Sequence, residues 1–255
     1  MRHNFVNDIG DYAKYALLRA FCVNAHPPLK LGVIWYLTDH EEQNTDGRRR
    51  PHLSNDGWDT VDPELLLQMR AIESQLQGIA DLHLNLIEQS EVLPPDTVYF
   101  SKPLPAFTGS YSQRIAQRAE WFANAKQATA GCNLLFLDPD NGLEVKSVRP
   151  GSRFAGKYVT LPEIAELTAD GALVILYQHC DRSPWRAQRA KIHDQLVAGI
   201  GPQLYIRSVR FGAFGARAFF CLTTDPTMAT IINIGLDTLA KRVANWDRVH
   251  TFRFE

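Results

Sequence analysis

The stretch Leu134-Leu-Phe-Leu-Asp-Pro-Asp-Asn-Gly142 decides the fold prediction for this chain. Four apolar residues run into Asp138, a proline, a second acid and an Asn-Gly pair. This pattern is typical of a buried parallel strand that ends in a functional loop. In open α/β sheets, ligands bind just beyond the carboxyl ends of the strands. We therefore expect the functional site at this loop, with the rest of the chain as its scaffold.

The composition is that of an ordinary globular protein. The chain has 255 residues, 45% hydrophobic and 22% charged, which suits a single α/β domain over residues 1–255. A net charge of −1 means that only a local basic patch could serve nucleic acid. The four cysteines form no C-x-x-C pair, which indicates reduced thiols and a cytoplasmic protein. No apolar run reaches the roughly 18 residues that span a bilayer, so we expect no membrane association.

Strand-like and helix-like segments alternate along the chain. The expected strands are residues 31–37, 82–87, 97–100, 134–137, 171–177, 205–211 and 218–223. The expected helices are residues 12–21, 62–80, 112–128, 160–168, 184–198 and 231–243. This order favours an α/β fold with a doubly wound, Rossmann-like, mostly parallel sheet and helices on both faces. The hairpin at 205–223 predicts a C-terminal antiparallel strand at the edge of that sheet.

Polar groups gather where the expected strands end. Thr38 and Asp39 follow the first strand, and His179 follows the strand at residues 171–177. Because the carboxyl ends of parallel strands share one edge of a sheet, we expect these groups near Asp138.

A polar segment also precedes the first expected helix. His3, Asn7 and Asp8 come before it, and Asp8 or Asp11 can cap its first turn. A capped amphipathic helix alone does not account for this density of Asn, Asp and His residues.

Three segments together resemble a known family. Arg2-His-x-Phe5 is followed by Gly10-Asp-Tyr-Ala-Lys-Tyr15, Asp138-Pro-Asp-Asn141 forms the loop, and Gly171–Tyr177 and Arg217–Leu222 follow as strands. This order is similar to the methyltransferase fold that uses S-adenosylmethionine, and most similar to the branch that methylates adenine N6 in ribosomal RNA. The loop stands where that family has Asp-Pro-Pro-Tyr.

The resemblance implies a function and a set of site residues. In the family, the loop acid and a backbone carbonyl accept hydrogen bonds from the adenine amine, and an aromatic residue stacks on the extruded base. The implied partner is RNA or DNA, and the implied cofactor is S-adenosylmethionine. Asp138 would be the acceptor, and the catalytic residues would be Asp138, Asp140, Asn141 and His179. The cofactor would be held by His3, Asp11, Lys14, Tyr36, Thr38 and Asp39.

The sequence departs from the family pattern at two places. Asn141 occupies the place of the aromatic residue and cannot stack comparably on a base. The turn after Leu37 has no glycine before Gly47, whereas a nucleotide-binding turn uses glycines to let the backbone approach the cofactor. The cofactor turn is therefore degenerate.

A metal-dependent nuclease or phosphodiesterase is an alternative interpretation. Asp138, Asp140 and Glu144, with Lys146, form a carboxylate-rich cluster of the kind that binds Mg²⁺. A bound Mg²⁺ could activate water against a phosphodiester.

A third interpretation is a non-catalytic relic of the fold that binds a nucleotide or a partner. A strand-ending turn in which Asp and Asn cap their own backbone would by itself explain Asp140, Asn141 and Gly142. It explains less well why two separate strands end in polar groups at one edge.

Overall fold

The structure is a computed structural model of the whole chain. It describes residues 6–23, 25–38, 50–54, 57–76, 84–213, 215–244, 246 and 252–255.

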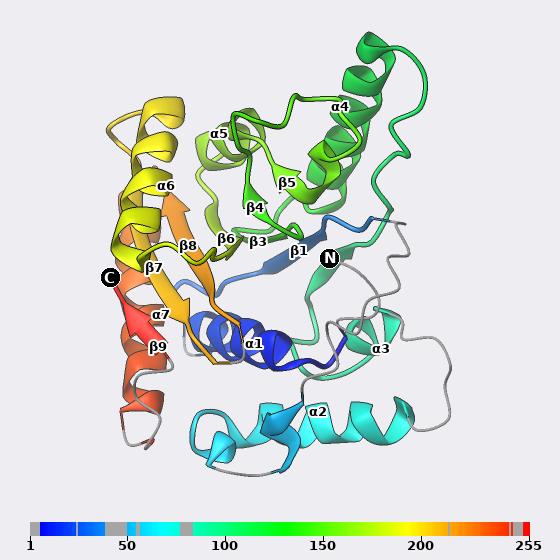
Figure 1. Cartoon of the computed structure of the whole chain (residues 1–255). Helices are drawn as coiled ribbons and strands as arrows, with labels where there is room; N and C mark the ends of the chain where they lie inside the picture. The colour runs from blue at the N-terminus through cyan, green and yellow to red at the C-terminus, as the bar shows by residue number, and fades with distance from the viewer. Residues whose placement is uncertain are drawn as a thin grey trace.

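A central sheet of seven strands carries the fold (Figure 1), in the order β2-β1-β3-β6-β8-β7-β9. The strands are β1 (Leu31–Trp35), β2 (Val98–Phe100), β3 (Leu134–Asp138), β6 (Leu173–His179), β7 (Tyr205–Phe211), β8 (Arg217–Thr223) and β9 (Phe252–Phe254). β4 (Gly142–Leu143) and β5 (Tyr158–Val159) form a separate parallel pair beyond the end of β3. The predicted α/β fold with a mostly parallel, Rossmann-like sheet is confirmed.

The direction of the strands fixes which residues meet at the carboxyl edge. β2, β1, β3 and β6 run parallel, and the register places Trp35 beside Asp138. β8 runs antiparallel to both β6 and β7. The predicted hairpin is present, but its reversed strand lies inside the sheet, and the short antiparallel β9 takes the edge.

Helices cover both faces of the sheet (Figure 1). The helices are α1 (Ile9–Cys22), α2 (Pro63–Leu76), α3 (Asn85–Glu88), α4 (Tyr111–Ala128), α5 (Leu161–Ala169), α6 (Trp185–Ile200) and α7 (Pro226–Val243), with short 3₁₀ turns at Pro51–Ser54, Trp58–Thr60 and Ala155–Lys157. No helix in the described part of the chain is long and apolar enough to cross a membrane.

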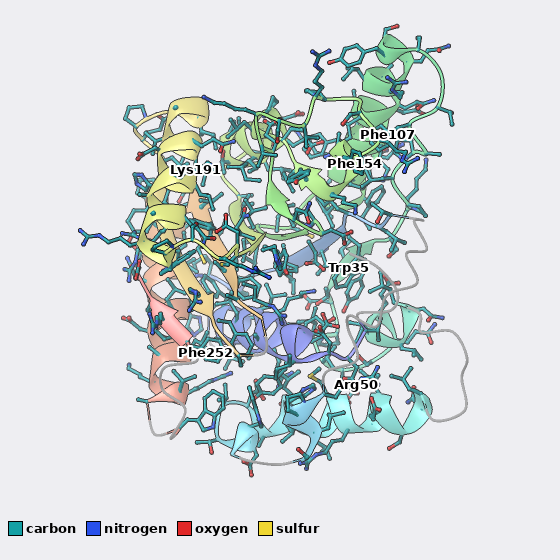
Figure 2. All side chains as sticks on the ribbon, in the orientation of Figure 1. Trp35, Arg50, Phe107, Phe154, Lys191 and Phe252 are labelled. Atoms are coloured by element: carbon teal, nitrogen blue, oxygen red, sulfur yellow. The ribbon has the colours of Figure 1, made fainter. Side chains whose placement is uncertain are left out.

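Strand alternation divides the interior into two cores. Trp35, Phe136 and Tyr177 face the side of α1, α2 and α7, and Figure 2 labels Trp35 there. Tyr36 directly follows Trp35, and Leu137 directly follows Phe136. Both face the other side, that of α4, α5 and α6. Asp138 has the same parity as Phe136, so its side chain is directed toward α1.

The structure corrects two sequence expectations. The described part of the expected strand at residues 82–87 is a turn at Leu84 followed by helix α3, in which Ile87 is buried. Helix α7 begins at Pro226, five residues before the expected start, because Asp225 caps it and proline suits the first helical turn.

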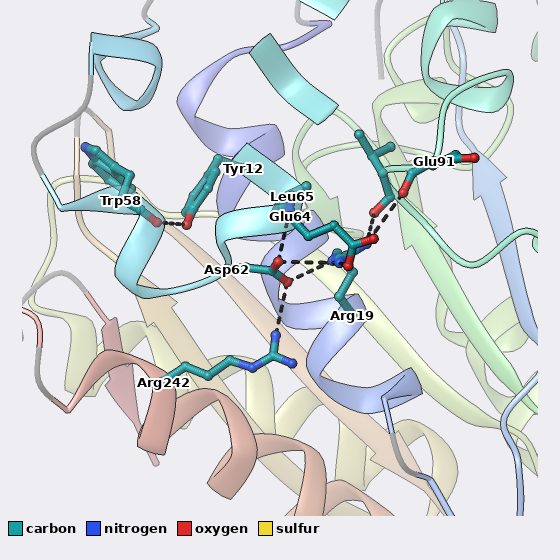
Figure 3. A network of polar contacts seen from close by, with 9 residues as sticks. Tyr12, Arg19, Trp58, Asp62, Glu64, Leu65, Glu91 and Arg242 are labelled. Carbon is teal, nitrogen blue, oxygen red and sulfur yellow. Dashed lines mark hydrogen bonds and ion pairs between the residues drawn. The ribbon is translucent and has the colours of Figure 1, made fainter. Parts of the chain in front are cut away.

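Asp62 ties three helices together on the α1 side (Figure 3). Its carboxylate accepts hydrogen bonds from the Leu65 N–H at the start of α2, from Arg19 Nε of α1 at 2.8 Å and from Arg242 Nη1 of α7 at 3.1 Å. One buried carboxylate therefore caps α2 and pairs with two guanidinium groups.

Candidate functional site

The first turn of α1 is held in a fixed shape by two carboxylates. Asn7 has a left-handed backbone (φ 67°), which turns the chain into the helix. Asp8 is the N-cap: its Oδ1 accepts a hydrogen bond from the Asp11 N–H at 2.9 Å. Asp11 Oδ2 in turn accepts one from the Asn7 N–H at 2.9 Å. Asp8 is thus confirmed as the cap, and Asp11 is oriented by the backbone before the helix.

Lys14 joins this turn to the loop after β3. Its Nζ lies 2.9 Å from Asp11 Oδ1 and 2.8 Å from Asp138 Oδ2, and all three side chains are buried. A buried charge is costly unless it is paired and hydrogen-bonded, and here one ammonium contacts two carboxylates. The structure therefore brings together Asp11, Lys14 and Asp138, three of the residues singled out from the sequence.

Aromatic rings surround the ammonium on its other sides. The Lys14 Nζ lies 5.6–6.0 Å from four ring centroids, those of Tyr15, Trp35, Phe136 and Tyr177. Ring faces attract a cation at this range. We call this arrangement of Asp11, Lys14, Asp138 and the four rings the Lys14 cluster.

The charges of the cluster shift one another's protonation. Burial alone lowers the pKa of Lys14, but the ion pairs with Asp11 and Asp138 outweigh it and raise this pKa above its ordinary value. Burial raises the pKa of Asp11 to about 6, against the opposing effect of Lys14 and with a contribution from Asp8. Burial also raises the pKa of Asp8, although the Arg217 guanidinium opposes the shift. The cluster is anionic overall and holds one carboxyl that titrates near neutrality.

Arg217 closes the cluster from the first residue of β8. Its guanidinium packs against Gly10 so closely that a β-carbon at that position would overlap it. A side chain at position 10 would therefore displace the Arg217 guanidinium and the Asp8 carboxylate.

The loop after Asp138 is held by its own backbone and by one amide side chain. Gln178 Oε1 accepts a hydrogen bond from the Leu143 N–H at 2.9 Å, and its Nε2 donates to the Asn141 carbonyl at 3.0 Å. The same carbonyl accepts the His179 N–H, and the Asn141 N–H donates to Lys157 O. Asn141 is thus engaged through its backbone, and its side chain is half-buried.

Asp140 and His179 lie at the outer rim of this loop. Asp140 is half-buried and follows Asp138 by two residues. The His179 side chain is exposed, and its strand neighbour is Arg217. Partial desolvation by the surrounding chain and the Arg217 charge lower the pKa of His179 from its ordinary value, so this imidazole is neutral near pH 7.

The proposed cofactor residues are divided between the two faces of the sheet. Tyr36 is fully buried on the α5 side, where its hydroxyl donates to Glu163 Oε2 at 3.3 Å. The structure therefore does not bring Tyr36 to Asp138, because strand alternation turns it to the opposite face. Thr38 lies beyond it at the end of β1, with a methyl group near Gly156. His3 and Asp39 lie outside the described residues.

The carboxylates of the metal alternative are also separated. Glu144 Oε1 accepts the Leu161 N–H at 2.7 Å and so serves the start of α5. Asp138 faces Lys14 instead. Within the ranges that the structure describes, no group of three or more His, Cys, Asp or Glu side chains could hold a metal ion.

Several residues in the cluster or next to it were not singled out from the sequence as site residues. They are Asp8, Tyr15, Trp35, Phe136, Tyr177, Gln178 and Arg217, which belong to the cluster or contact it or its loop. Of these, Asp8 was marked by its capping position. No sequence signal linked Arg217 to Gly10, because the two are brought together only by the insertion of β8.

Comparison with known proteins leaves the family of the chain open. A scan of protein-family models finds no match, and a search of curated proteins finds none. Among solved structures, the chain is similar to protein LPL1258 from Legionella pneumophila str. Philadelphia 1, described with the family model DUF519. The two share 11% identity and a TM-score of 0.46, over 98% of this chain and 97% of the other. At that level the likeness carries no argument about function.

Proposed function

We propose that this protein is a methyltransferase that uses S-adenosylmethionine and acts on the amine of a nucleic-acid base. The observation that carries the proposal is the Lys14 cluster at the carboxyl edge of β1 and β3. A buried acid at the end of a central strand, fixed by a cation from the first helix, provides a preorganised hydrogen-bond acceptor for an amine.

The sheet agrees with the resemblance found in the sequence. A reversed strand, β8, lies beside β6, as in the methyltransferase fold. The N-terminal segment that resembles the family opening places Asp11 and Lys14 against the loop that resembles the family's Asp-Pro-Pro-Tyr. Two of the three segments that carry the resemblance therefore meet in one ion cluster.

The residues at this edge suit a cationic nucleoside cofactor. The buried hydroxyls of Tyr15 and Thr38 have no hydrogen-bond partner among the described residues. Buried polar groups are normally paired, so a bound ligand would give these two hydroxyls the partners that they lack. The surplus of carboxylates over cations around Lys14 favours a positively charged sulfonium, and the aromatic rings favour it further.

Each residue then has a defined task in the proposed reaction. When bound, the cofactor would supply a methyl group on a sulfonium: its neutral thioether would leave as the amine took the methyl group, and the amine proton would pass to solvent. The contribution of the protein to such a transfer is mainly positioning. Asp138 accepts a hydrogen bond from the attacking amine and orients its lone pair. Lys14 keeps Asp138 in place, and Asp11 keeps Lys14 in place. Asn141 leaves the base without the family's aromatic stacking partner, so the proposal names an amine and not adenine in particular.

Calorimetry with S-adenosylmethionine and with its demethylated product tests the cofactor. We expect both to bind the native chain, and binding by neither at millimolar concentration would refute the proposal. Transfer of a labelled methyl group to oligonucleotides tests the reaction. Asp138→Asn should lower that rate by about a hundredfold or more. Asp181→Asn, which changes a fully exposed carboxylate after β6, is the matched control and should leave the rate unchanged.

A further inference from the structure

Two segments next to the site concentrate positive charge in a chain whose net charge is −1. Residues 97–119 and 145–159 together contain seven Lys or Arg residues and no Asp or Glu. Arg118 is buried in its pair with Glu163, so the charge at the surface comes from the other six residues, Lys102, Arg114, Lys146, Arg149, Arg153 and Lys157. Such a local concentration is an electrostatic footprint for a polyanion.

The two segments pack against each other in the structure. Arg114 Nη1 donates to Gly109 O at 2.7 Å, while its Nε donates to Gly151 O at 2.5 Å. The Gly151 position also lies against the Tyr111 and Ile115 side chains. The N-terminus of α4 and the segment before β5 therefore form one continuous surface.

Exposed aromatic rings lie on the same surface. Tyr111 is 52% exposed and Phe154 is 57% exposed, and they are the exposed aromatic side chains among the large hydrophobic residues of the described chain. The Arg153 guanidinium lies 5.8 Å from the Phe154 ring centroid. Figure 2 labels Phe154 and Phe107 on this part of the molecule. Neither exposed ring is buried against the core, and both are placed to stack on a flat ligand.

This surface adjoins the Asp138 loop. The Asn141 N–H donates to Lys157 O at 2.9 Å, so the segment before β5 is bonded directly to that loop. The Gly156 position contacts Phe107 and Thr38, which brings the same segment to the end of β1. A ligand on the surface would therefore reach the carboxyl edge of the sheet.

We infer that Tyr111, Arg149, Arg153, Phe154 and Lys157, here called the stacking surface, bind single-stranded nucleic acid. Cations that follow a phosphate backbone and rings that stack on bases are the two features of single-strand recognition. A duplex hides the faces of its bases, so the exposed rings favour a single strand. The inference rests on the proposed function in taking that strand as the substrate of the Asp138 site.

Fluorescence anisotropy tests the stacking surface without any methyl donor. The probes are a labelled RNA strand of about 20 nucleotides, the DNA strand of the same sequence and the corresponding duplex. We expect both single strands to bind more tightly than the duplex. Phe154→Ala should weaken single-strand binding by about tenfold, and Tyr111→Ala should weaken it similarly. Ile234→Ala, at a position 53% exposed on α7, is the matched control and should bind as the native chain does.

Salt dependence tests the cations separately from the rings. Changing both Arg149 and Arg153 to Ala should reduce the slope of log K against log salt by about 1.4, or about 0.7 for each phosphate that is no longer neutralised. Lys241→Ala, an exposed change on α7, should leave the slope unchanged. Circular dichroism of each variant verifies that the fold is retained.

Three results would overturn the inference. They are equal affinity of Phe154→Ala and the native chain, duplex binding as tight as single-strand binding, and binding to anionic lipid vesicles with no binding to either strand. Because the titrations contain no cofactor, they separate the two proposals. If the chain binds single strands but not S-adenosylmethionine, the stacking surface is supported and the methyltransferase proposal is refuted. If it binds S-adenosylmethionine but no strand, the methyltransferase proposal is supported and the stacking surface is refuted.

Discussion

Two buried ion clusters lie on opposite faces of the sheet and differ in how completely they are paired. On the α5 side, Arg118 donates to both oxygens of Glu163, at 2.6 and 2.9 Å, and its remaining donors reach the carbonyls of Ala155 and Tyr158. Glu163 also accepts the Thr160 N–H and the Tyr36 hydroxyl. In this pair, called the Arg118 cluster, one cation matches one anion.

The Lys14 cluster has more carboxylates than its cation can balance. Asp11 and Asp138 share one ammonium, Asp8 lies nearby with Arg217 as its opposing charge, and the Tyr15 hydroxyl has no partner among the described residues. The first arrangement stabilises the attachment of β5 to α4 and α5. The second retains an unbalanced charge and an unpaired hydroxyl, which are the features that the proposed function assigns to a ligand. The contrast predicts opposite responses to substitution.

The largest expected effect is on the Arg118 cluster. Arg118→Met should lower the free energy of unfolding by about 4 kcal/mol, because it leaves Glu163 buried without its partner. Adding Glu163→Gln, which preserves the capping box with Thr160, should recover at least half of that loss. Urea denaturation of the native chain and both variants measures the loss and its recovery. If Arg118→Met lowers the free energy of unfolding by less than about 1 kcal/mol, the pair does not stabilise the fold in the way proposed.

A smaller and pH-dependent loss is expected for Lys14→Met. Without the ammonium, the buried Asp11 carboxyl has its pKa raised further, and a raised carboxyl pKa gives stability at low pH that is lost as pH rises. We expect a loss of about 3 kcal/mol at pH 8 and about 1 kcal/mol at pH 5. Urea titrations at the two pH values measure the difference. An equal loss at both pH values would contradict the titration of Asp11 near neutral pH.

Asp11→Asn should stabilise the protein near neutral pH. The pKa of Asp11 is raised from 3.8 to about 6, so its favourable contribution is complete below pH 3.8 and is lost as pH rises through 6. Asparagine resembles the protonated form, and we expect a gain of about 2 kcal/mol at pH 7 that vanishes near pH 4. Thermal unfolding of the variant and the native chain at a series of pH values measures this gain in stability. A destabilised variant at pH 7 would show that the ion pair with Lys14 outweighs the burial of Asp11.

The smallest expected effects compare one helix cap in each region. Thr160→Ala removes the cap of α5 and should cost about 1 kcal/mol. Asp8→Asn keeps a capping oxygen on α1 and removes a buried charge, so the change should stay within about 0.5 kcal/mol. Chemical denaturation at pH 7 measures the change in the free energy of unfolding for each of the two variants. If Asp8→Asn lowers the free energy of unfolding more than Thr160→Ala does, the Asp8 charge stabilises the fold through its interaction with Arg217.

The sequence predicted much of the fold because the signals are local. The strand expected at residues 31–37 and the helix expected at residues 160–168 were both predicted correctly, since each depends on neighbours within a few residues. The expected strand at 82–87 was wrong in its described part, because a short apolar run does not distinguish a strand from a helical turn. The edge position expected for the reversed strand was also wrong, because strand order depends on contacts that are distant in the chain.

The candidate site was predicted in part. Asp138, Asp11 and Lys14 were chosen separately, and the structure joins them within 3 Å. Tyr36 was chosen for its position after β1, but the two-residue period of the strand turns it to the other core. The reaction and the cofactor stay predictions that the experiments above test.

The sequence by itself determined where polar loops end buried strands, because the alternation of apolar runs, turn residues and caps is a local property. The tertiary structure alone decided that Lys14, 124 residues from Asp138 along the chain, is its ion partner. It also decided that β8 carries Arg217 to Gly10, and that two basic segments form one surface beside the site. The physical reason is that pairing of buried charges and packing of surfaces depend on distances in space, which a pattern along one chain does not contain.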